Sequence, residues 1–394
     1  MLDAVIALWG SRGHAGISAR GVAQEAGLPT SSIYHHFGSL EHLFLEGQAH
    51  ALIRAERWCA LQLDLVGQAP GGCPDAFPAL FAALIDAWSQ EHRALCLTWH
   101  ECHLLAARDP HYGAAINGWR ELWVGFWEEL CSRCGLAGSG EISSYVFDAE
   151  SLMHMLQWRR PVDRACLDEF SRGWGCWLTG SLATEGPWRG FARGEALKTR
   201  PDVREQEGVA GQIAAAAADV VEQSGVAGLT HRAVAERAGV TLGTVSYNFR
   251  TSSDLIRATF ETIYTRIVPA AGAGGSPPVG PPVTTLERAE GLRMASPLIL
   301  ALEELVVAVA RDPAFRAFAP QLRYLRGRSS GAVLQAALGT ERVISSLDAA
   351  LYSGFLAGQG RGLRGRQDAA LDQDIARTTG QVLALLGAVS GGAA

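Results

Sequence analysis

Tryptophan, cysteine and histidine are almost absent from the second half of this 394-residue chain. All eight cysteines precede residue 177, all eleven tryptophans precede residue 189, and only one of the eleven histidines, His231, lies beyond them. The two halves therefore differ in side-chain chemistry. If only one half binds a small molecule, the first half is the better candidate.

Long apolar runs are also missing, and no signal peptide is expected at the N-terminus. No apolar run reaches the roughly 18 residues that a membrane helix requires. The N-terminal MLDAVIALWG has neither a basic region nor a cleavage site of a signal peptide. We therefore expect a cytoplasmic protein without membrane contact, whose cysteines are reduced and mostly buried.

Signatures of catalysis are absent as well. The sequence contains no Walker loop, no G-x-S-x-G motif and no paired catalytic carboxylates. We expect neither an enzyme nor a bound cofactor. The net charge of −6 argues against non-specific binding to polyanions, although one face of the protein can still be locally basic.

One stretch of the chain occurs twice. Residues 16–43 and 228–255 align without a gap at an offset of 212 residues. Identical residues recur in register, namely Gly16 and Gly228, Arg20 and Arg232, Val22-Ala23 and Val234-Ala235, Ala26-Gly27 and Ala238-Gly239, Phe37 and Phe249, and Leu43 and Leu255.

Each copy encodes two short helices joined by a tight turn. Ser18 or Thr230 is placed to cap the first helix with its hydroxyl group. Gly27 ends that helix because glycine tolerates the left-handed conformation. A second helix follows, with an apolar face that turns inward and a polar face that stays free. This pattern predicts a helix-turn-helix, whose second helix enters the major groove of DNA.

At these residues both copies resemble the DNA-binding domain of the TetR (tetracycline repressor) family. The family motif reads R-x-[VI]-A-x-x-A-G, then [ST]-[IV]-Y-x-x-F, then an acidic residue and Leu, and residues 20–43 fit it closely. Residues 232–255 fit a variant of it. The family commonly has a phosphate-contacting Lys three residues after the Phe, where this chain has Leu40 and Ser252.

The resemblance implies an all-α fold of two TetR-like units in tandem. We expect helix-turn-helix domains at 1–47 and 208–259, helical ligand-binding and dimerisation domains at 48–183 and 260–394, and a linker at 184–207. A second internal match supports duplication of the helical domains too. Ala107-Arg108-Asp109-Pro110 recurs as Ala310-Arg311-Asp312-Pro313, and Glu101 recurs as Glu304, at an offset of 203.

Duplication also predicts how the halves assemble. Family members are usually homodimers that pair the last two helices of each subunit. Here helices expected at 141–157 and 163–182 can pair with those at 340–360 and 369–388 of the same chain, which gives a monomer that acts as an internal pseudo-dimer. The alternative is that each half dimerises with its copy in another chain. A short tether gives an effective concentration of about mM, which favours the internal pair.

The predicted DNA-facing residues lie on and around the two second helices. In the first copy they are Arg20, Thr30, Ser31, Ser32, Tyr34 and His35. In the second copy they are Arg232, Thr241, Leu242, Gly243, Thr244, Ser246, Tyr247 and Arg250. Arg20 and Arg232 are candidates for phosphate contacts, and an internal ion pair with an acidic residue is an equal alternative. The two helix-turn-helix motifs, called the readers below, present different side chains to DNA. Two unlike readers predict an asymmetric operator.

The resemblance implies a ligand pocket among the helices that follow each connecting helix, and these connecting helices are expected at about 39–65 and 252–268. The candidate residues of the pocket, all in the first half, are Trp88, Trp99, His100, His103, Trp119, Trp123 and Trp127. An aromatic stripe at helical spacing is more often part of the core. His92, Cys96, His100 and His103 share one helix face, and Cys131 and Cys134 form one pair, but neither set completes a metal site, so no metal is predicted.

Together these features predict a sequence-specific transcriptional regulator, a repressor that is released from double-stranded DNA by an apolar or aromatic small molecule. The alternative is a ligand sensor that acts through protein contacts, with one or both readers disabled.

Overall fold

The computed structural model describes residues 1–67, 73–181, 183–199, 207–267, 297–339, 343–364, 366 and 370–387. All regular elements in these ranges are helices. None of them combines the length and apolar character needed to cross a lipid bilayer. The predicted all-α fold is therefore confirmed for the described part of the chain.

The first half starts with three helices that form a small domain. These are α1 (Leu2–Arg12), α2 (Ala19–Glu25) and α3 (Ser31–Phe37), with the short 3-10 turn η1 (His14–Gly16) after α1. The long α4 (Leu40–Gly67) connects this domain to the helical body, as predicted. The body contains α5 (Phe77–Asp86), α6 (Arg93–Arg108), α7 (Ala114–Arg133), α8 (Gly140–Met155) and α9 (Arg160–Leu178). A π-helical turn at Ala87–Glu91 separates α5 from α6.

The second half repeats this order. Its small domain consists of α11 (Gly208–Ser224), η5 (Val226–Gly228), α12 (His231–Ala238) and α13 (Leu242–Asn248), and α14 (Ser252–Ile267) connects it to the body. The body contains α16 (Pro297–Arg311), η6 (Pro313–Phe318), α17 (Ala319–Tyr324), α18 (Arg328–Leu338), α19 (Ser346–Leu363) and α20 (Leu371–Gly387). Residues 340–342, which were expected to begin a helix, lie outside the described residues.

The stretch predicted as a bare linker contains an additional helix, α10 (Pro187–Lys198). Proline at the first helical position is favourable because its missing N–H is not needed there. The Glu169 carboxylate of α9 then accepts the N–H groups of Trp188 and Arg189 at 2.9 and 2.7 Å. This cap comes from outside the stretch, so the Gly- and Pro-rich composition alone did not indicate a helix.

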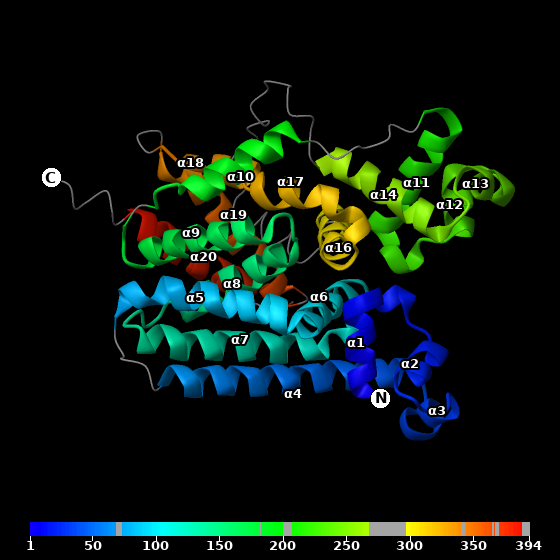
Figure 1. The fold of residues 1–394 in the computed structure, drawn as a ribbon, viewed down its shortest axis with the longest axis horizontal. Helices are drawn as coiled ribbons and strands as arrows, with labels where there is room; N and C mark the ends of the chain where they lie inside the picture. Colours follow the sequence, from blue (N-terminus) through cyan, green and yellow to red (C-terminus); the bar gives the residue numbers. More distant parts are fainter. Residues whose placement is uncertain are drawn as a thin grey trace.

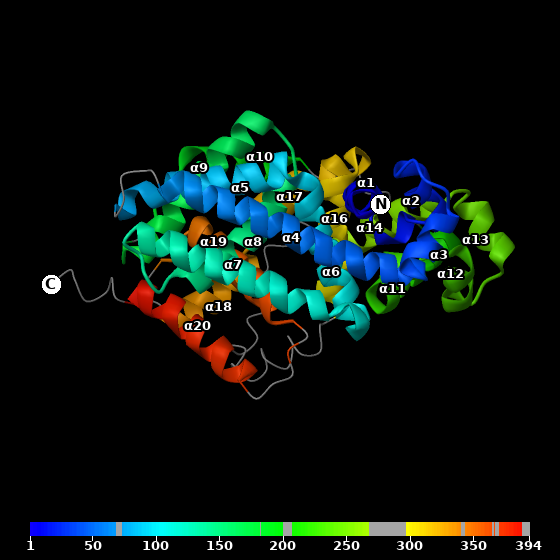
Figure 2. The ribbon, with the colours of Figure 1, turned by 90° about the horizontal axis from the view of Figure 1, so that it is seen from below.

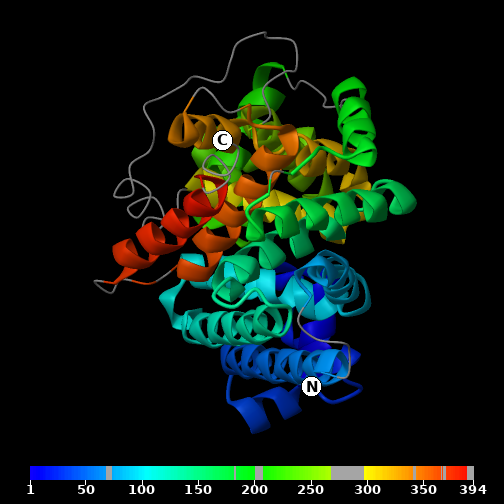
Figure 3. The ribbon, with the colours of Figure 1, turned by 90° about the vertical axis from the view of Figure 1, so that its left-hand side faces the viewer.

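The two halves pack against each other along their last helices. Helices α8 and α9 contact α19 and α20, which is the pairing expected within one chain. Figure 3 shows the blue and cyan helices of the first half below the orange and red helices of the second. One hydrophobic core runs through both halves and includes Phe147 and Phe170 of the first half and Leu351 and Phe355 of the second.

Polar groups cross the same interface at buried positions. The Trp177 indole N–H donates to Asp348 at 2.9 Å, and the Tyr324 hydroxyl donates to Asp163 at 2.5 Å. The guanidinium group of Arg326 pairs with Glu150. A buried ion pair that loses one partner leaves an uncompensated charge, so these contacts oppose separation of the halves.

Candidate nucleic-acid interface and its coupling to the helical body

The two small domains lie at the same end of the molecule. Helices α2 and α3 and helices α12 and α13 gather on the right in Figure 1 and again in the perpendicular view of Figure 2. The domains touch through η1 and η5. Helices α3 and α13 correspond to the second helix of each predicted motif. They are called the recognition helices below.

The local geometry of both motifs follows the sequence. The Ser18 hydroxyl accepts the Gly21 N–H, and the Thr230 hydroxyl accepts the Ala233 N–H, each at 3.1 Å. These contacts confirm the predicted caps. Gly27 and Gly239 have φ angles of 64° and 66°, in the region that favours glycine. The turn between the helices therefore requires glycine at this position.

A small apolar core holds each recognition helix in place. Ile33 of α3 is buried with Val22 and Leu43, and Val245 of α13 is buried with Val234 and Leu255. Phe249 is buried and Phe37 is half-buried. Because the inward faces are fixed, the outward faces of both helices have a defined orientation.

Most of the predicted DNA-facing residues are exposed. Tyr34 is 55% exposed and Tyr247 is 82% exposed. The other exposed candidates are Arg20, Thr30, Ser31, His35, Arg232, Thr241, Leu242, Gly243, Ser246 and Arg250. Ser32 and Thr244 are half-buried. His36 of α3, which is not among the predicted DNA-facing residues, is exposed beside His35, with ring centroids 4.9 Å apart.

The arginine candidates have no partner among the residues that the structure describes. In the described ranges, Arg20, Arg232 and Arg250 form no ion pair or hydrogen bond through their guanidinium groups. By contrast, Arg237 of α12 is held by Asp219 at 3.0 Å. The acidic partner considered for Arg20 and Arg232 is therefore not found among these residues, and both guanidinium groups face solvent.

The two recognition helices differ in which polar groups are free. The Thr241 hydroxyl accepts the Thr244 N–H at 3.1 Å and forms a hydrogen bond with the Thr244 hydroxyl at 2.8 Å. Both hydroxyl groups are therefore engaged in the cap at the start of α13. Thr30 makes no such cap at the start of α3. The first recognition helix therefore offers more free hydroxyl groups to DNA than the second.

Two crossed ion pairs join α6 of the first half to α16 of the second half, beside the small domains. Arg311 of α16 pairs with Glu101 of α6, and Arg108 of α6 pairs with Glu304 of α16 at 2.6 Å. The sequence repeat at offset 203 identified these four residues as equivalent in pairs. It did not indicate that each arginine pairs with the glutamate of the other half.

The same two carboxylates hold the ends of α1 and α11. Glu101 accepts the His14 N–H at 3.1 Å, and Glu304 accepts the Val226 N–H at 2.5 Å. Both N–H groups follow a glycine with positive φ, at 69° for Gly13 and 71° for Gly225. Each small domain is thereby attached to the body at the point where the two halves meet.

The predicted ligand residues lie inside the first half. All seven of them are buried, on the π-helical turn, α6 and α7: Trp88, Trp99, His100, His103, Trp119, Trp123 and Trp127. Trp99 stacks edge-on against His103 and donates its indole N–H to Asp148 at 2.5 Å. The indole N–H groups of Trp119, Trp123 and Trp127 have no acceptor among the described residues.

A buried charge network lies beside this cluster and close to both histidines. Arg361 donates to Asp148 at 2.6 Å, and Arg364 donates to Glu303 at 2.6 Å. Burial lowers the pKa of His100 to about 4 and lowers the pKa of His103 well below its ordinary value. Both rings are therefore neutral near pH 7.

The remaining cysteine and histidine candidates do not assemble into a site. Among the described residues, no group of three or more potential ligand side chains is arranged to hold a metal ion. All eight cysteines are free thiols and six of them are buried, as expected. Burial raises the pKa of Cys131 to about 12, so this thiol stays protonated.

Comparison with known families agrees with this architecture. The family model described as bacterial regulatory proteins, tetR family, matches residues 1–46 and 213–259. A sequence search of curated proteins found no relative that matches the chain. The two matches fall on the two small domains at one end of the molecule. The chain therefore contains two TetR-like units in tandem, each with a DNA-binding domain of this family of transcriptional regulators.

Proposed function

We propose that the chain is a transcriptional repressor in which one polypeptide replaces the usual dimer. Its two readers bind one asymmetric operator, and a small molecule releases it. The observation that carries this proposal is the presence of two unlike, outward-facing recognition helices at one end of a molecule whose halves share one core. Helix-turn-helix dimers place two such helices about 34–36 Å apart in successive major grooves.

The exposed residues support the assignment of one DNA half-site to each recognition helix. Tyr34 and His35 read bases in one half-site, and Leu242 and Tyr247 read bases in the other. Leu242 is 52% exposed and offers an apolar contact to a thymine methyl group. Unlike side chains at equivalent positions select unlike half-sites.

Release by a ligand requires a connection between a binding site and the readers. Helix α6 provides one, because it carries His100 and His103 in the core and Glu101 and Arg108 in the crossed ion pairs. The aromatic cluster nearby, with three indole N–H groups that lack an acceptor among the described residues, supports an aromatic or apolar effector that carries an acceptor, bound in the first half. A shift of α6 on binding changes the angle between the readers.

Salt dependence of DNA binding tests the DNA-reading role. The logarithm of the association constant should fall steeply with the logarithm of salt concentration, and Arg232→Ala should reduce this slope by about one phosphate contact. Arg237→Ala is the matched control, since Arg237 is already held by Asp219. Absence of DNA binding at about 50 mM salt would favour the second candidate, a ligand sensor without active readers. Leu40 and Ser252 in place of lysine support that candidate.

A further inference from the structure

A cavity of about 390 Å³ lies between the two small domains and the body. Both halves contribute to its walls. The end of α1 and α6 come from the first half, and η5, α14 and α16 come from the second. Ligand sites typically measure about 300–1,000 Å³, so this volume suits a compact small molecule. The cavity is separate from the tryptophan cluster described above.

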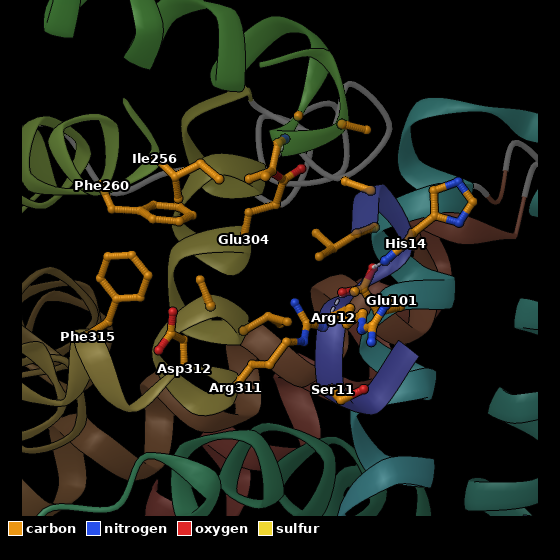
Figure 4. A pocket seen from close by; sticks show the side chains of 18 of the residues that line it. Ser11, Arg12, His14, Glu101, Ile256, Phe260, Glu304, Arg311, Asp312 and Phe315 are labelled. Carbon is orange, nitrogen blue, oxygen red and sulfur yellow. Dashed lines mark hydrogen bonds and ion pairs between the residues drawn. The ribbon is translucent and has the colours of Figure 1, made fainter. Parts of the chain in front are cut away.

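The cavity has an apolar end and a charged end. Figure 4 shows Ile256, Phe260 and Phe315 on one side and Arg12, Glu101 and Arg311 on the other. Phe260 and Phe315 pack edge to face, with ring centroids 5.4 Å apart. Such walls fit a molecule with an apolar body and one polar head group.

At the charged end the glutamates already accept hydrogen bonds, whereas arginine donors are left without a partner among the described residues. Glu101 and Glu304 each accept a backbone N–H and an arginine, and Asp312 accepts the Ala314 N–H at 2.8 Å.

In contrast, Arg12 is exposed and its guanidinium group has no partner in the described part of the chain. The buried Nε of Arg311 also lacks a partner there, and so does Nδ1 of His14, which is a donor in one tautomer only. A ligand must therefore bring an acceptor, and two nearby guanidinium groups favour an acceptor with negative charge.

We propose that this cavity binds a small amphipathic carboxylate, with its apolar body against Phe260 and Phe315 and its carboxylate between Arg12 and Arg311. The site spans both halves, so it exists only while they are packed together. A bound carboxylate competes with Glu101 for Arg311, and this loosens the contact that ties the first reader to the second half. This consequence for DNA rests on the proposed repressor function.

The test measures binding to the full chain without DNA. The probes are 3-phenylpropionate, phenylacetate and 4-methylpentanoate, each beside its primary amide, in saturation-transfer NMR followed by calorimetry. At least one carboxylate should bind, and its amide should bind at least tenfold more weakly. Arg12→Gln should weaken carboxylate binding at least tenfold.

Two variants block the cavity itself. Ala308→Phe fills it from α16, and Ala227→Trp obstructs it from an exposed position of η5, where folding is less at risk. Both should abolish binding, whereas Ala60→Phe on the exposed face of α4 should not. The proposal is overturned if no carboxylate binds, if the amides bind equally well, or if the blocking variants keep full affinity. Carboxylate binding that leaves DNA affinity unchanged would support the site and contradict ligand release.

Discussion

Glu101→Gln removes the negative charge from one of the two ion pairs that join α6 of the first half to α16 of the second half. The side chains of Glu101 and Arg311 are 9% and 15% exposed. Removing one partner of a buried pair typically costs about 3–5 kcal/mol, because the other charge stays buried without compensation. Glutamine still accepts the His14 N–H, so we expect a loss of about 3 kcal/mol, at the lower end of this range.

A double-mutant cycle separates the pair from other effects of each substitution. Arg311→Met keeps most of the apolar stem, and alone it should also cost about 3 kcal/mol. The double variant should lose about 4 kcal/mol, because neither charge is then left unpaired, which gives a coupling energy of about 2 kcal/mol.

Urea denaturation followed by tryptophan fluorescence and circular dichroism measures all four proteins. The exposed pair between Asp3 and Arg54 is the control, and Asp3→Asn should cost less than about 1 kcal/mol. Strictly additive single substitutions, with coupling below about 0.5 kcal/mol, would refute the reasoning.

Three further predictions concern the assembly and its interior. Light scattering at micromolar concentration should give the mass of one chain, 41.9 kDa, and a stable species of twice that mass would contradict the internal pseudo-dimer. Gly358→Ala should destabilise the protein by several kcal/mol, because a Cβ atom there would lie 1.9 Å from the Tyr145 carbonyl oxygen across the α8–α19 interface. Gly380→Ala is the control, because a Cβ atom there meets nothing within 4 Å, and it should be neutral or stabilising by up to about 1 kcal/mol. Equal losses of stability at Gly358 and Gly380 would contradict close packing of α8 against α19. Burial lowers the pKa of His103 in the folded protein below its value in the unfolded chain. The contribution of the neutral buried ring to the free energy of unfolding is therefore complete above about pH 6.5 and is lost as the pH falls below that value. Between pH 6.5 and 5, His103→Leu should therefore lose stability less steeply than the wild type, by up to about 1.4 kcal/mol per pH unit, while the exposed His36→Gln should follow the wild type; identical slopes for all three proteins would contradict a neutral buried ring.

Local features of the readers were predictable from the sequence because short-range rules determine them. Ser18 and Thr230 cap helices whose first turns follow directly in the chain, and Gly27 and Gly239 occupy a turn that requires positive φ. The ungapped repeat established that both motifs share one geometry. The exposed positions of Tyr34 and Tyr247 followed from helical periodicity.

Features that depend on the meeting of distant segments were not predictable in the same way. The repeat showed that Glu101 and Glu304 are equivalent, but not that each pairs with an arginine of the other half. Helix α10 is capped by Glu169, which lies outside the stretch that forms it. The cavity between the small domains likewise arises from surfaces of both halves, and its walls have no continuous sequence pattern.

Selection of binding sites from random double-stranded DNA tests the central claim most directly. If one chain carries two unlike readers on one rigid body, the enriched sequences should contain two different half-sites with centres roughly 10 bp, or a multiple of that, apart. Tyr34→Ala should relax the preference in one half-site, and Tyr247→Ala should relax it in the other, by about 1–3 kcal/mol per affected base pair. Enrichment of a perfect palindrome, or of no sequence at all, would contradict the account.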